Sequence, residues 1–372
     1  MNVTQVDYGL IPGTQEPDQL LELFPTLTQW SESLLTAGAS RVSVVQRFHT
    51  EARITRQGVE YVFCSSVRRL HQAARRLAPD VLHVNGLGFP VQTWRLRQAV
   101  GSRAIVIQDH AAGEPPARIA RPGMTIRRAV WRAGLGAADA FFFTAPAQAD
   151  AWKHAGLIRP EQVVFGVLEA GTSMKPLQHE KARAASLFSG NPAALWVGRL
   201  DANKDPITVL AGFERMADAF PGATLTMIHG SDDLLPQVRA ELDSSPRLKG
   251  RVRLVGAVPH AAMAAFFSGA DIFVLGSHHE GSGFALLEAC ACGTLPVVAD
   301  NPAFRAIAGE IGELWPIGDA DACGRALIKA AQTPDWGASR ARTRAHFDRS
   351  LSWPVVAAKA LAAYEAVAMQ HR

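Results

Sequence analysis

The chain has 372 residues, of which 48% are hydrophobic and 19% are charged, a balance typical of a soluble globular protein. No apolar run reaches the roughly 18 residues that a bilayer span needs, and residues 1–19 lack a basic segment followed by an apolar one, so we expect neither a membrane helix nor a signal peptide. The net charge is only +4, and no aromatic-rich basic motif indicates nucleic-acid binding.

Apolar strand-like runs alternate with helix-like stretches along the whole chain. This alternation predicts parallel sheets covered by helices on both faces, as in Rossmann-like α/β domains. Because the length exceeds one comfortable core, we expect two such domains. The predicted division is a first domain at 1–175, a linker at 176–192, a second domain at 193–350 and a C-terminal helix at 351–372. We expect the last helix to pack back on the first domain.

In the first half, the predicted strands are residues 3–8, 42–46, 61–64, 81–84, 105–108 and 140–144. The dipeptide Gln57-Gly58 between apolar runs predicts a hairpin within 53–63. Two of the strands lead into polar residues, Asn85 and the pair Asp109-His110. Ligand sites in doubly wound sheets form at the carboxyl ends of the strands, so these polar residues are candidates for a site.

The positive charge is concentrated in the first half, where residues 1–175 hold 19 Lys and Arg against 14 Asp and Glu. Much of the surplus comes from five arginines interleaved with apolar side chains: Arg118, Arg121, Arg127, Arg128 and Arg132. Such a segment can lie on an anionic membrane or hold an anionic acceptor. A solvated helix face is the alternative.

The second half repeats the α/β scheme, with predicted strands at 194–197, 224–228, 252–255, 271–275 and 295–299 and predicted helices at 207–219, 236–242, 261–269 and 353–369. The four cysteines form no CxxC pair. Cys290 and Cys292 point in different directions on a helix, so we expect reduced thiols without a shared metal.

The most informative pattern lies between residues 277 and 300. A buried strand leads to Glu280, three small residues follow, and a helix carries Glu288 eight positions later. A Gly-rich turn before a helix N-terminus suits a phosphate or diphosphate, and Gly281 and Gly283 let the backbone approach it. Glu280 then indicates contact with sugar hydroxyls, and Glu288 contact with ribose. An ordinary strand–turn–helix unit with two surface acids is the alternative.

A second anion signal directly follows the strand at 194–197. Arg199 and Lys204 are spaced R-x4-K on the loop that leaves the sheet. Two fixed cations at this place can neutralise a diphosphate and stabilise charge on a leaving group. Since no acidic cluster suited to Mg²⁺ is evident, these cations can take the place of a metal, and we expect no metal or other cofactor.

Three blocks of the second half resemble the signature blocks of retaining glycosyltransferases of family four: G-R-L-D-A-N-K at 198–204, V-R-L-V-G-A-V-P at 252–259 after Arg251, and E-G-S-G-F-A-L-L-E-A at 280–289. The E-x7-E pattern of Glu280 and Glu288 is a hallmark of that family. The resemblance implies the GT-B architecture, in which two Rossmann-like domains face each other across a cleft. It covers most of residues 190–330, whereas the first half matches more loosely.

The resemblance also implies roles for single residues. Arg199 and Lys204 would hold the donor diphosphate, Glu280 would contact the sugar and Glu288 the ribose. The phosphates and sugar would meet the backbone of Gly281, Ser282, Gly283 and Phe284. The base would lie near residues 251–256, with Arg251, Val255 and Gly256 as candidates. His110 is similar to the strand-terminal histidine that faces the donor sugar in the family, although a histidine that only caps a strand is the alternative.

Two segments depart from the family pattern. The family often has a Gly-Gly loop after the first strand, whereas residues 9–14 offer a single glycine, Gly13, near the expected place. Family members also commonly carry a P-N-G-V-D-like segment, where this chain has Leu-Glu-Ala-Gly-Thr-Ser at 168–173. The contribution of both loops to substrate binding is therefore in question.

The resemblance implies a hexosyltransferase-like enzyme that moves a sugar from a UDP- or GDP-sugar to a glycan, a glycolipid or a small molecule, as in polysaccharide biosynthesis. We expect a cytoplasmic protein, with peripheral contact to an anionic membrane through residues 118–132 as an option. Other readings are a GT-B sugar-nucleotide epimerase, which needs no acceptor, and a non-catalytic protein that binds nucleotide sugars. A phosphorylase would need a lysine-bound pyridoxal phosphate, and nothing in the sequence marks such a lysine.

Overall fold

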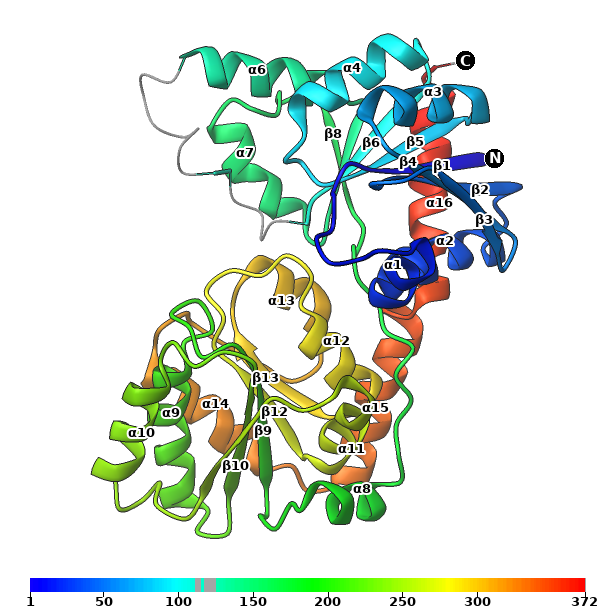
Figure 1. Ribbon diagram of the computed structural model, residues 1–372. Coiled ribbons are helices and arrows are strands. Elements are labelled where there is room, and N and C mark those ends of the chain that lie inside the picture. The colour runs from blue at the N-terminus through cyan, green and yellow to red at the C-terminus, as the bar shows by residue number, and fades with distance from the viewer. Residues whose placement is uncertain (111–114, 117–124, 372) are drawn as a thin grey trace. The chain divides into compact units, whose positions relative to one another are not determined.

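The computed structural model describes residues 1–110, 115–116 and 125–371, and the chain divides into two compact units. Unit 1 comprises Met1–Gly171 and Trp353–Arg372, and unit 2 comprises Thr172–Ser352. Each unit is built on one mostly parallel sheet (Figure 1). The predicted α/β class with two Rossmann-like sheets is therefore confirmed.

The sheet of unit 1 has the strand order β3-β4-β2-β1-β5-β6-β7-β8 in the described part of the chain. Its strands are β1 (Asn2–Asp7), β2 (Arg41–Arg47), β3 (Ala52–Arg56), β4 (Val59–Cys64), β5 (Val81–Asn85), β6 (Ala104–Gln108), β7 (Ala140–Phe143) and β8 (Val163–Gly166). Among the described strands of this sheet, only the β3–β4 pair is antiparallel, and it is the predicted hairpin. Gln57 and Gly58 both have positive φ at its turn, as a two-residue hairpin loop requires.

The helical segments of unit 1 are α1 (Pro17–Leu23), α2 (Pro25–Thr36), α3 (Val67–Leu77), α4 (Pro90–Val100), α6 (Thr125–Gly136), η1 (Pro146–Ala149), α7 (Asp150–His154) and α16 (Trp353–Met369). Helix α3 illustrates why they form. Ser66 caps its first turn by accepting a hydrogen bond from the Arg69 amide, and the buried residues Leu70, Ala74 and Leu77 recur at helical spacing.

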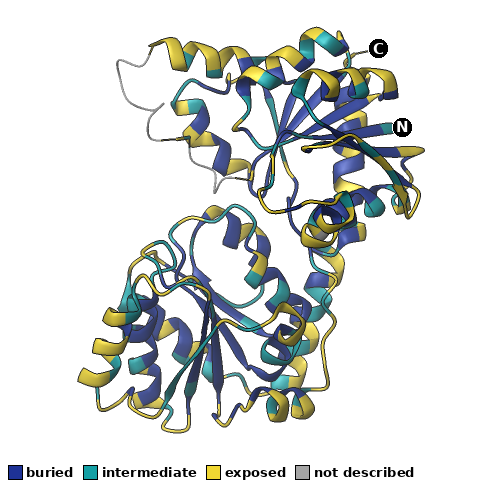
Figure 2. Cartoon of the chain, viewed as in Figure 1, coloured by how far each residue is buried: buried dark blue, intermediate teal, exposed yellow. Residues whose placement is uncertain are grey.

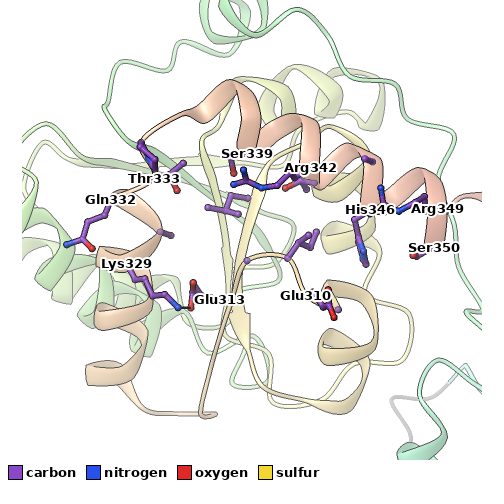
Figure 3. Close-up of a pocket in the computed structure, with 18 residues that line it drawn as sticks. Glu310, Glu313, Lys329, Gln332, Thr333, Ser339, Arg342, His346, Arg349 and Ser350 are labelled. Atoms are coloured by element: carbon purple, nitrogen blue, oxygen red, sulfur yellow. Dashed lines mark hydrogen bonds and ion pairs between the residues drawn. The ribbon is translucent and has the colours of Figure 1, made fainter.

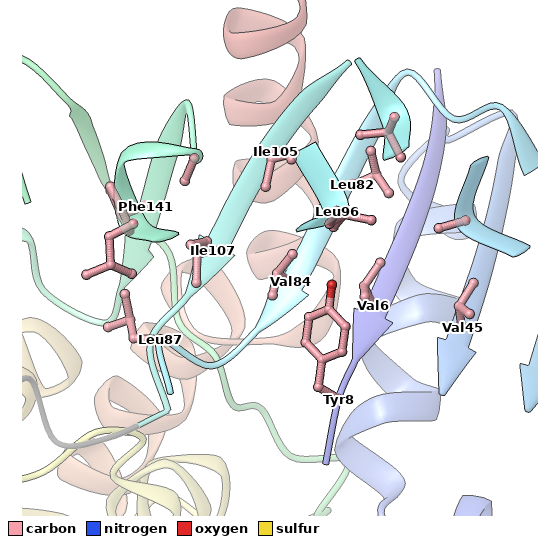
Figure 4. Packing of buried hydrophobic residues seen from close by; sticks show 14 of the residues in the cluster. Val6, Tyr8, Val45, Leu82, Val84, Leu87, Leu96, Ile105, Ile107 and Phe141 are labelled. Carbon is pink, nitrogen blue, oxygen red and sulfur yellow. The ribbon is translucent and has the colours of Figure 1, made fainter. Parts of the chain in front are cut away.

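The core of unit 1 occupies both faces of its sheet, because successive strand residues point to opposite sides. On one face, Leu82 and Val84 of β5 and Ile105 and Ile107 of β6 pack with Leu96 of α4 (Figure 4). On the other face, His83 and Phe142 meet Tyr364 of α16, whose hydroxyl lies 2.6 Å from His83 Nδ1. The C-terminal helix is therefore part of the core of unit 1.

The sheet of unit 2 has the order β11-β10-β9-β12-β13-β14 in the described residues. Its strands are β9 (Ala193–Gly198), β10 (Thr224–His229), β11 (Val252–Gly256), β12 (Ile272–Leu275), β13 (Leu295–Ala299) and β14 (Glu313–Trp315). Its helices are α8 (His179–Ser186), α9 (Pro206–Ala219), α10 (Leu235–Ser244), α11 (His260–Gly269), α12 (Phe284–Ala291), α13 (Pro302–Ala308), α14 (Ala320–Ala331) and α15 (Trp336–Ser350). In both units the strands are mostly buried and the helices expose their outer faces (Figure 2).

The segment that we predicted as a linker, 176–192, is instead part of unit 2 and contains α8. A buried carboxylate explains its attachment. Asp271, which precedes β12, accepts hydrogen bonds from Arg183 of α8 at 3.1 Å and from Arg340 of α15 at 2.5 Å. Because its charge is paired in this way, Asp271 links α8 and α15 to the amino edge of the sheet. The chain passes between the units at Gly171 and again at Ser352.

Candidate functional site

The carboxyl edge of the unit 2 sheet holds two loops, residues 199–204 after β9 and residues 276–280 after β12. Asn203 joins them with three hydrogen bonds: its carbonyl accepts from the His278 amide at 2.8 Å, its Oδ1 accepts from the His279 amide at 3.0 Å, and its Nδ2 donates to the His279 carbonyl at 3.1 Å. Because β9 and β12 are neighbours, two segments that are 76 residues apart form one rigid surface.

Lys204 and Glu280 meet on this surface. The Lys204 ammonium forms an ion pair and a hydrogen bond with Glu280 Oε1, and the two side chains are 16% and 11% exposed. Asp201 fixes the turn before Lys204, since its Oδ1 accepts from the Lys204 amide at 2.9 Å. The structure thus brings together the predicted diphosphate cation and the predicted sugar carboxylate, which the sequence places far apart.

Arg199 lies on the same loop but faces outward. Its side chain is 65% exposed and pairs with Asp201 at 3.0 Å. Asp201 therefore links the two predicted cations, because it binds the Arg199 guanidinium and the Lys204 amide at once. An exposed arginine on a long side chain can turn toward an anion at little cost.

Helix α12 begins directly after the Gly281–Gly283 turn. Gly283 has a φ of +62°, and a Cβ at this position would lie 2.6 Å from an Ile307 methyl group, so only glycine fits the turn. Phe284, the first residue of α12, is exposed. The N-terminus of α12 contributes partial positive charge, and in the sequence it lies just after Glu280, which pairs with Lys204.

Glu288 of α12 is the second predicted carboxylate. It is half-buried, and its Oε1 lies 2.7 Å from Nε2 of the exposed His260, at the start of α11. Burial raises the pKa of Glu288, and the hydrogen bond with His260 opposes that rise. A carboxylate whose solvation is limited in this way favours hydrogen-bond donors such as hydroxyl groups.

The three residues that were predicted to lie near the nucleotide base are found at opposite edges of the unit 2 sheet. Val255 and Gly256 lie at the carboxyl end of β11, where Gly256 pairs with Ile228 beside an irregularity in the ladder. Arg251 precedes β11 at the amino edge, roughly 16 Å away by the rise of a strand, and donates to the Ala217 carbonyl at 2.5 Å. The structure therefore does not bring Arg251 to the predicted site, because five strand residues carry it to the opposite edge.

Unit 1 has its own polar cluster at the carboxyl edge of its sheet. Asp7 ends β1 and accepts hydrogen bonds from the Gly9 amide at 2.7 Å and from Asn85 Nδ2 at 3.3 Å. Nδ1 of His110, which follows β6, contacts Glu169 Oε2, and the side chains are 42% and 2% exposed. The buried Asp109 stands beside them. His110 is therefore held in an acidic cluster rather than capping a strand alone.

The charges of this cluster act on each other. Burial lowers the pKa of His110, but Glu169 and, less strongly, Asp7 and Asp109 raise it, and the net result is a raised pKa. Burial likewise raises the pKa of Asp7, against the hydrogen bonds from Gly9 and Asn85 and the charge of His110. The cluster thus favours a protonated imidazole at His110.

Gly13 lies on the loop after β1. It has a φ of +87°, and, apart from its two chain neighbours, no atom of the described residues lies within 4 Å of the place where a Cβ would be. The loop is anchored by Gln46, whose Nε2 donates to the Gly9 carbonyl at 2.8 Å, and by Thr14, which donates to the Ile11 carbonyl at 3.0 Å. These hydrogen bonds fix the loop that carries Gly13.

A cavity of about 860 Å³ opens at the other edge of the unit 2 sheet (Figure 3). It is lined by residues such as Leu295 and Glu313, which begin β13 and β14, and by Arg342 and His346 of α15. None of the predicted site residues lines it. We therefore assign the candidate site to the opposite, carboxyl edge, where the motif residues lie.

The basic segment is described only in part, because Arg118 and Arg121 lie outside the described residues. Arg127, Arg128 and Arg132 belong to α6, and Ile126 on the same helix is 81% exposed. Across the described residues no helix is long and apolar enough to cross a bilayer. The same residues include no group of three or more His, Cys, Asp and Glu side chains able to hold a metal ion.

Sequence reasoning missed the partners of the predicted residues. Glu169, His260 and Asn203 were not singled out, although each contacts a predicted residue or loop. Glu169 lies in the 168–173 segment that departs from the family pattern, and this departure was the available signal. Asn203 lies within the 198–204 block and His260 directly follows the 252–259 block, but neither block indicates these contacts, because they form between segments that meet only in the folded chain.

The chain has the GT-B fold, as comparison with solved structures shows. Sucrose-phosphate synthase from Thermosynechococcus elongatus matches with a TM-score of 0.72 at 20% identity and covers 99% of each chain. A protein from Anabaena solved with UDP and glucose matches with a TM-score of 0.68 at 14% identity, covering 98% of this chain and 99% of that one.

Residues 178–346 match the family model described as glycosyl transferases group 1. The phosphatidyl-myo-inositol mannosyltransferase of Mycolicibacterium smegmatis is 32% identical over 197 residues, which are 49% of this chain and 48% of the relative. The glycogen synthase of Mycobacterium tuberculosis is 32% identical over 182 residues, which are 45% of this chain and 41% of the relative. The matched region thus spans about half the length of these curated relatives.

Proposed function

We propose that the chain transfers a sugar from a nucleotide-diphosphate sugar to an acceptor hydroxyl, with retention of configuration at the anomeric carbon. The observation that carries the proposal is the Lys204–Glu280 pair at the carboxyl edge of unit 2, inside the group 1 segment. A cation for phosphate and a carboxylate for hydroxyl groups lie in contact there, next to a Gly-rich turn that opens a helix.

The donor is held by unit 2 in this proposal. Arg199 and Lys204 bind the diphosphate, while the turn from Gly281 to Phe284 meets the phosphates and the sugar. Glu280 accepts hydrogen bonds from sugar hydroxyls and Glu288 from the ribose. The base lies against Val255 and Gly256. In unit 1, His110 contacts the donor sugar, and Gly13 offers its backbone to the phosphates.

The chemistry is a substitution at the anomeric carbon. The acceptor oxygen forms the new bond on the face that the diphosphate leaves, the bond from the anomeric carbon to the phosphate oxygen breaks, and that oxygen takes the proton of the acceptor hydroxyl. The protein supplies orientation and charge stabilisation rather than a nucleophile. Lys204 and Arg199 neutralise the negative charge that grows on the leaving diphosphate and so take the place of a metal ion there.

A thermal-shift panel of nucleoside diphosphates and their sugars tests donor binding. A ligand present at 100 times its dissociation constant adds about 2.7 kcal/mol to the stability of the protein that binds it. We expect a shift with UDP or GDP and their sugars, but none with the corresponding nucleosides, which lack the diphosphate. The absence of a shift with every nucleotide would contradict the proposal.

Product assays separate the remaining functions. A transferase consumes the donor only when an acceptor is present, whereas an epimerase converts the nucleotide sugar without one. A protein that only binds would give the thermal shift and no product with any acceptor. The assay is therefore run with and without an acceptor, on the nucleotide sugars that give a shift.

We further propose that the acceptor is lipid-linked or otherwise anionic and that unit 1 touches an anionic membrane. The support is the set of basic side chains on α6 beside the exposed Ile126. Two relatives also carry lipid acceptors in their names, a phosphatidyl-myo-inositol mannosyltransferase and a cellobiosyl-diphosphopolyprenol mannosyltransferase. Co-sedimentation with anionic vesicles at low salt is expected, with release at high salt. No binding at low salt would exclude the membrane contact.

A further inference from the structure

The segment after β8 places one buried carboxylate against a residue of the candidate site. Glu169 is 2% exposed, and its Oε2 contacts Nδ1 of His110, whose side chain is 42% exposed. A histidine has two ring nitrogens, and the partner of one determines what the other presents. Since Glu169 engages Nδ1, the nitrogen that remains for a ligand is Nε2.

We propose that Glu169 is a positioning residue, which fixes the His110 ring through Nδ1 so that Nε2 carries a proton toward the donor sugar. The inference rests on the proposed function, because it assigns the work of His110 to a sugar hydroxyl. Residues 168–173, which depart from the family pattern, thereby serve to orient His110 within unit 1.

The backbone around Glu169 is held on both sides. Before it, the Val167 amide donates to the Phe143 carbonyl at 2.8 Å, and Gln108 donates to the Val167 carbonyl at 3.2 Å. After it, Gly171 lies against the Trp353 indole, where a Cβ would come within 2.6 Å of the ring. A carboxylate seated on such a segment cannot follow a moving histidine, so the histidine is oriented by it.

The surrounding charges favour the same protonated ring. Asp7 at the end of β1 and Asp109 beside His110 add to the effect of Glu169, and together they raise the pKa of His110 against the effect of burial. The other imidazole nearby, His83 of β5, does not compete for a proton, because burial lowers its pKa to about 3. Asn85 at the end of β5 is neutral and bonds Asp7. Of these two imidazoles, His110 is therefore the one whose protonated form is favoured.

The test is Glu169→Gln, which keeps the shape of the side chain and removes its charge. In protein with ¹⁵N-labelled histidine, the His110 signals are identified by their loss in His110→Ala and followed against pH. We expect the pKa of His110 to be lower in Glu169→Gln than in the unchanged protein. The exposed Glu161, paired with Arg159, supplies the control, and Glu161→Gln is expected to leave the titration unchanged.

Kinetics supply the second readout. Loss of one charge-assisted hydrogen bond is expected to lower kcat by roughly 10- to 100-fold near neutral pH, with a smaller change in KM for the donor. The fall in kcat as His110 loses its proton should move to lower pH in Glu169→Gln. In a His110→Ala background the same substitution should have no further effect on kcat, because Glu169 acts through the ring.

An unchanged His110 titration in folded Glu169→Gln protein, or additive losses in the double variant, would overturn the proposal. Folding is checked by circular dichroism. If Glu169→Gln does not fold, Glu169→Asp replaces it, because this variant keeps the charge on a shorter side chain. An unaltered His110 titration and an unaltered pH profile of kcat in Glu169→Asp would also overturn the proposal. The titration needs no substrate, so the absence of any transferase activity would refute the proposed function without deciding the role of Glu169.

Discussion

The carboxyl edges of the two sheets carry different sets of charged side chains. In unit 2, basic side chains contact carboxylates in pairs, of which Lys204–Glu280 and His260–Glu288 are the most relevant to the site. In unit 1, three acidic side chains surround a single histidine, His110. The first arrangement suits a ligand with both phosphate and hydroxyl groups, and the second suits the holding of one proton. Similar strand–helix scaffolds therefore carry two distinct tasks, set by the few residues that follow each strand.

The two carboxyl edges also differ in how far the sequence reveals them. The unit 2 pairs come from short motifs, in which Lys204 follows Arg199 and Glu288 follows Glu280 at fixed spacings. The unit 1 cluster draws one or two residues from each of four strand ends: Asp7, Asn85, Asp109 with His110, and Glu169. Because no spacing links these strand ends, only the folded chain brings them together.

Lys204→Ala is expected to have the largest effect on turnover. Removing one group that stabilises developing charge typically lowers kcat by roughly 10²–10³-fold. The substitution also takes the ammonium away from the Glu280 carboxylate, so a decrease in stability is expected as well. Steady-state kinetics together with thermal unfolding separate the two effects, since measurements below the unfolding transition report on kcat alone.

Lys329→Ala provides the matched control for Lys204→Ala. Lys329 also forms an ion pair, with Glu313 at 2.9 Å, but it lies exposed at the amino edge of the same sheet. Because exposed pairs contribute about 0–1 kcal/mol, we expect neither kcat nor stability to change much. If both variants lose turnover equally, or if Lys204→Ala keeps the full rate, the carboxyl edge of unit 2 is not the site of the reaction.

The α/β class and most strands could be predicted from the sequence, because buried parallel strands give short apolar runs between helical stretches. Strands β8 and β14 were missed. Both are short strands at a sheet edge, and apart from the buried Trp315 of β14 their side chains are partly or fully exposed, so neither stands out in the sequence as a buried strand does. The predicted linker failed for a different reason: Pro176 and Pro192 do interrupt the periodicity, but Arg183 binds the segment to unit 2 through Asp271. Composition does not reveal such a tertiary ion pair.

Site residues could be predicted where they belong to a continuous sequence motif. Contacts between residues that are distant in the sequence could not. The positions of Lys204, Glu280, Gly283 and Glu288 follow from the loops and the helix that the sequence indicates. The contact of Glu169 with His110 does not, because the two residues are 59 positions apart and meet only when β6 and β8 join the same sheet. Arg251 shows the opposite case, because it is adjacent to a motif block in the sequence but lies at the amino end of β11, away from the predicted site.

Arg251→Ala is expected to have the smallest effect and sharpens the contrast between the two edges of unit 2. The lost hydrogen bond to the Ala217 carbonyl is part-buried and contributes about 0.5–1.5 kcal/mol, so a small decrease in the unfolding temperature should follow. The thermal shift caused by nucleotides should persist in full, because Arg251 stands at the amino edge of β11, away from Gly256. If the shift disappeared while the protein remained folded, the base would bind at the amino edge. Val255 and Gly256 would then lose their proposed role.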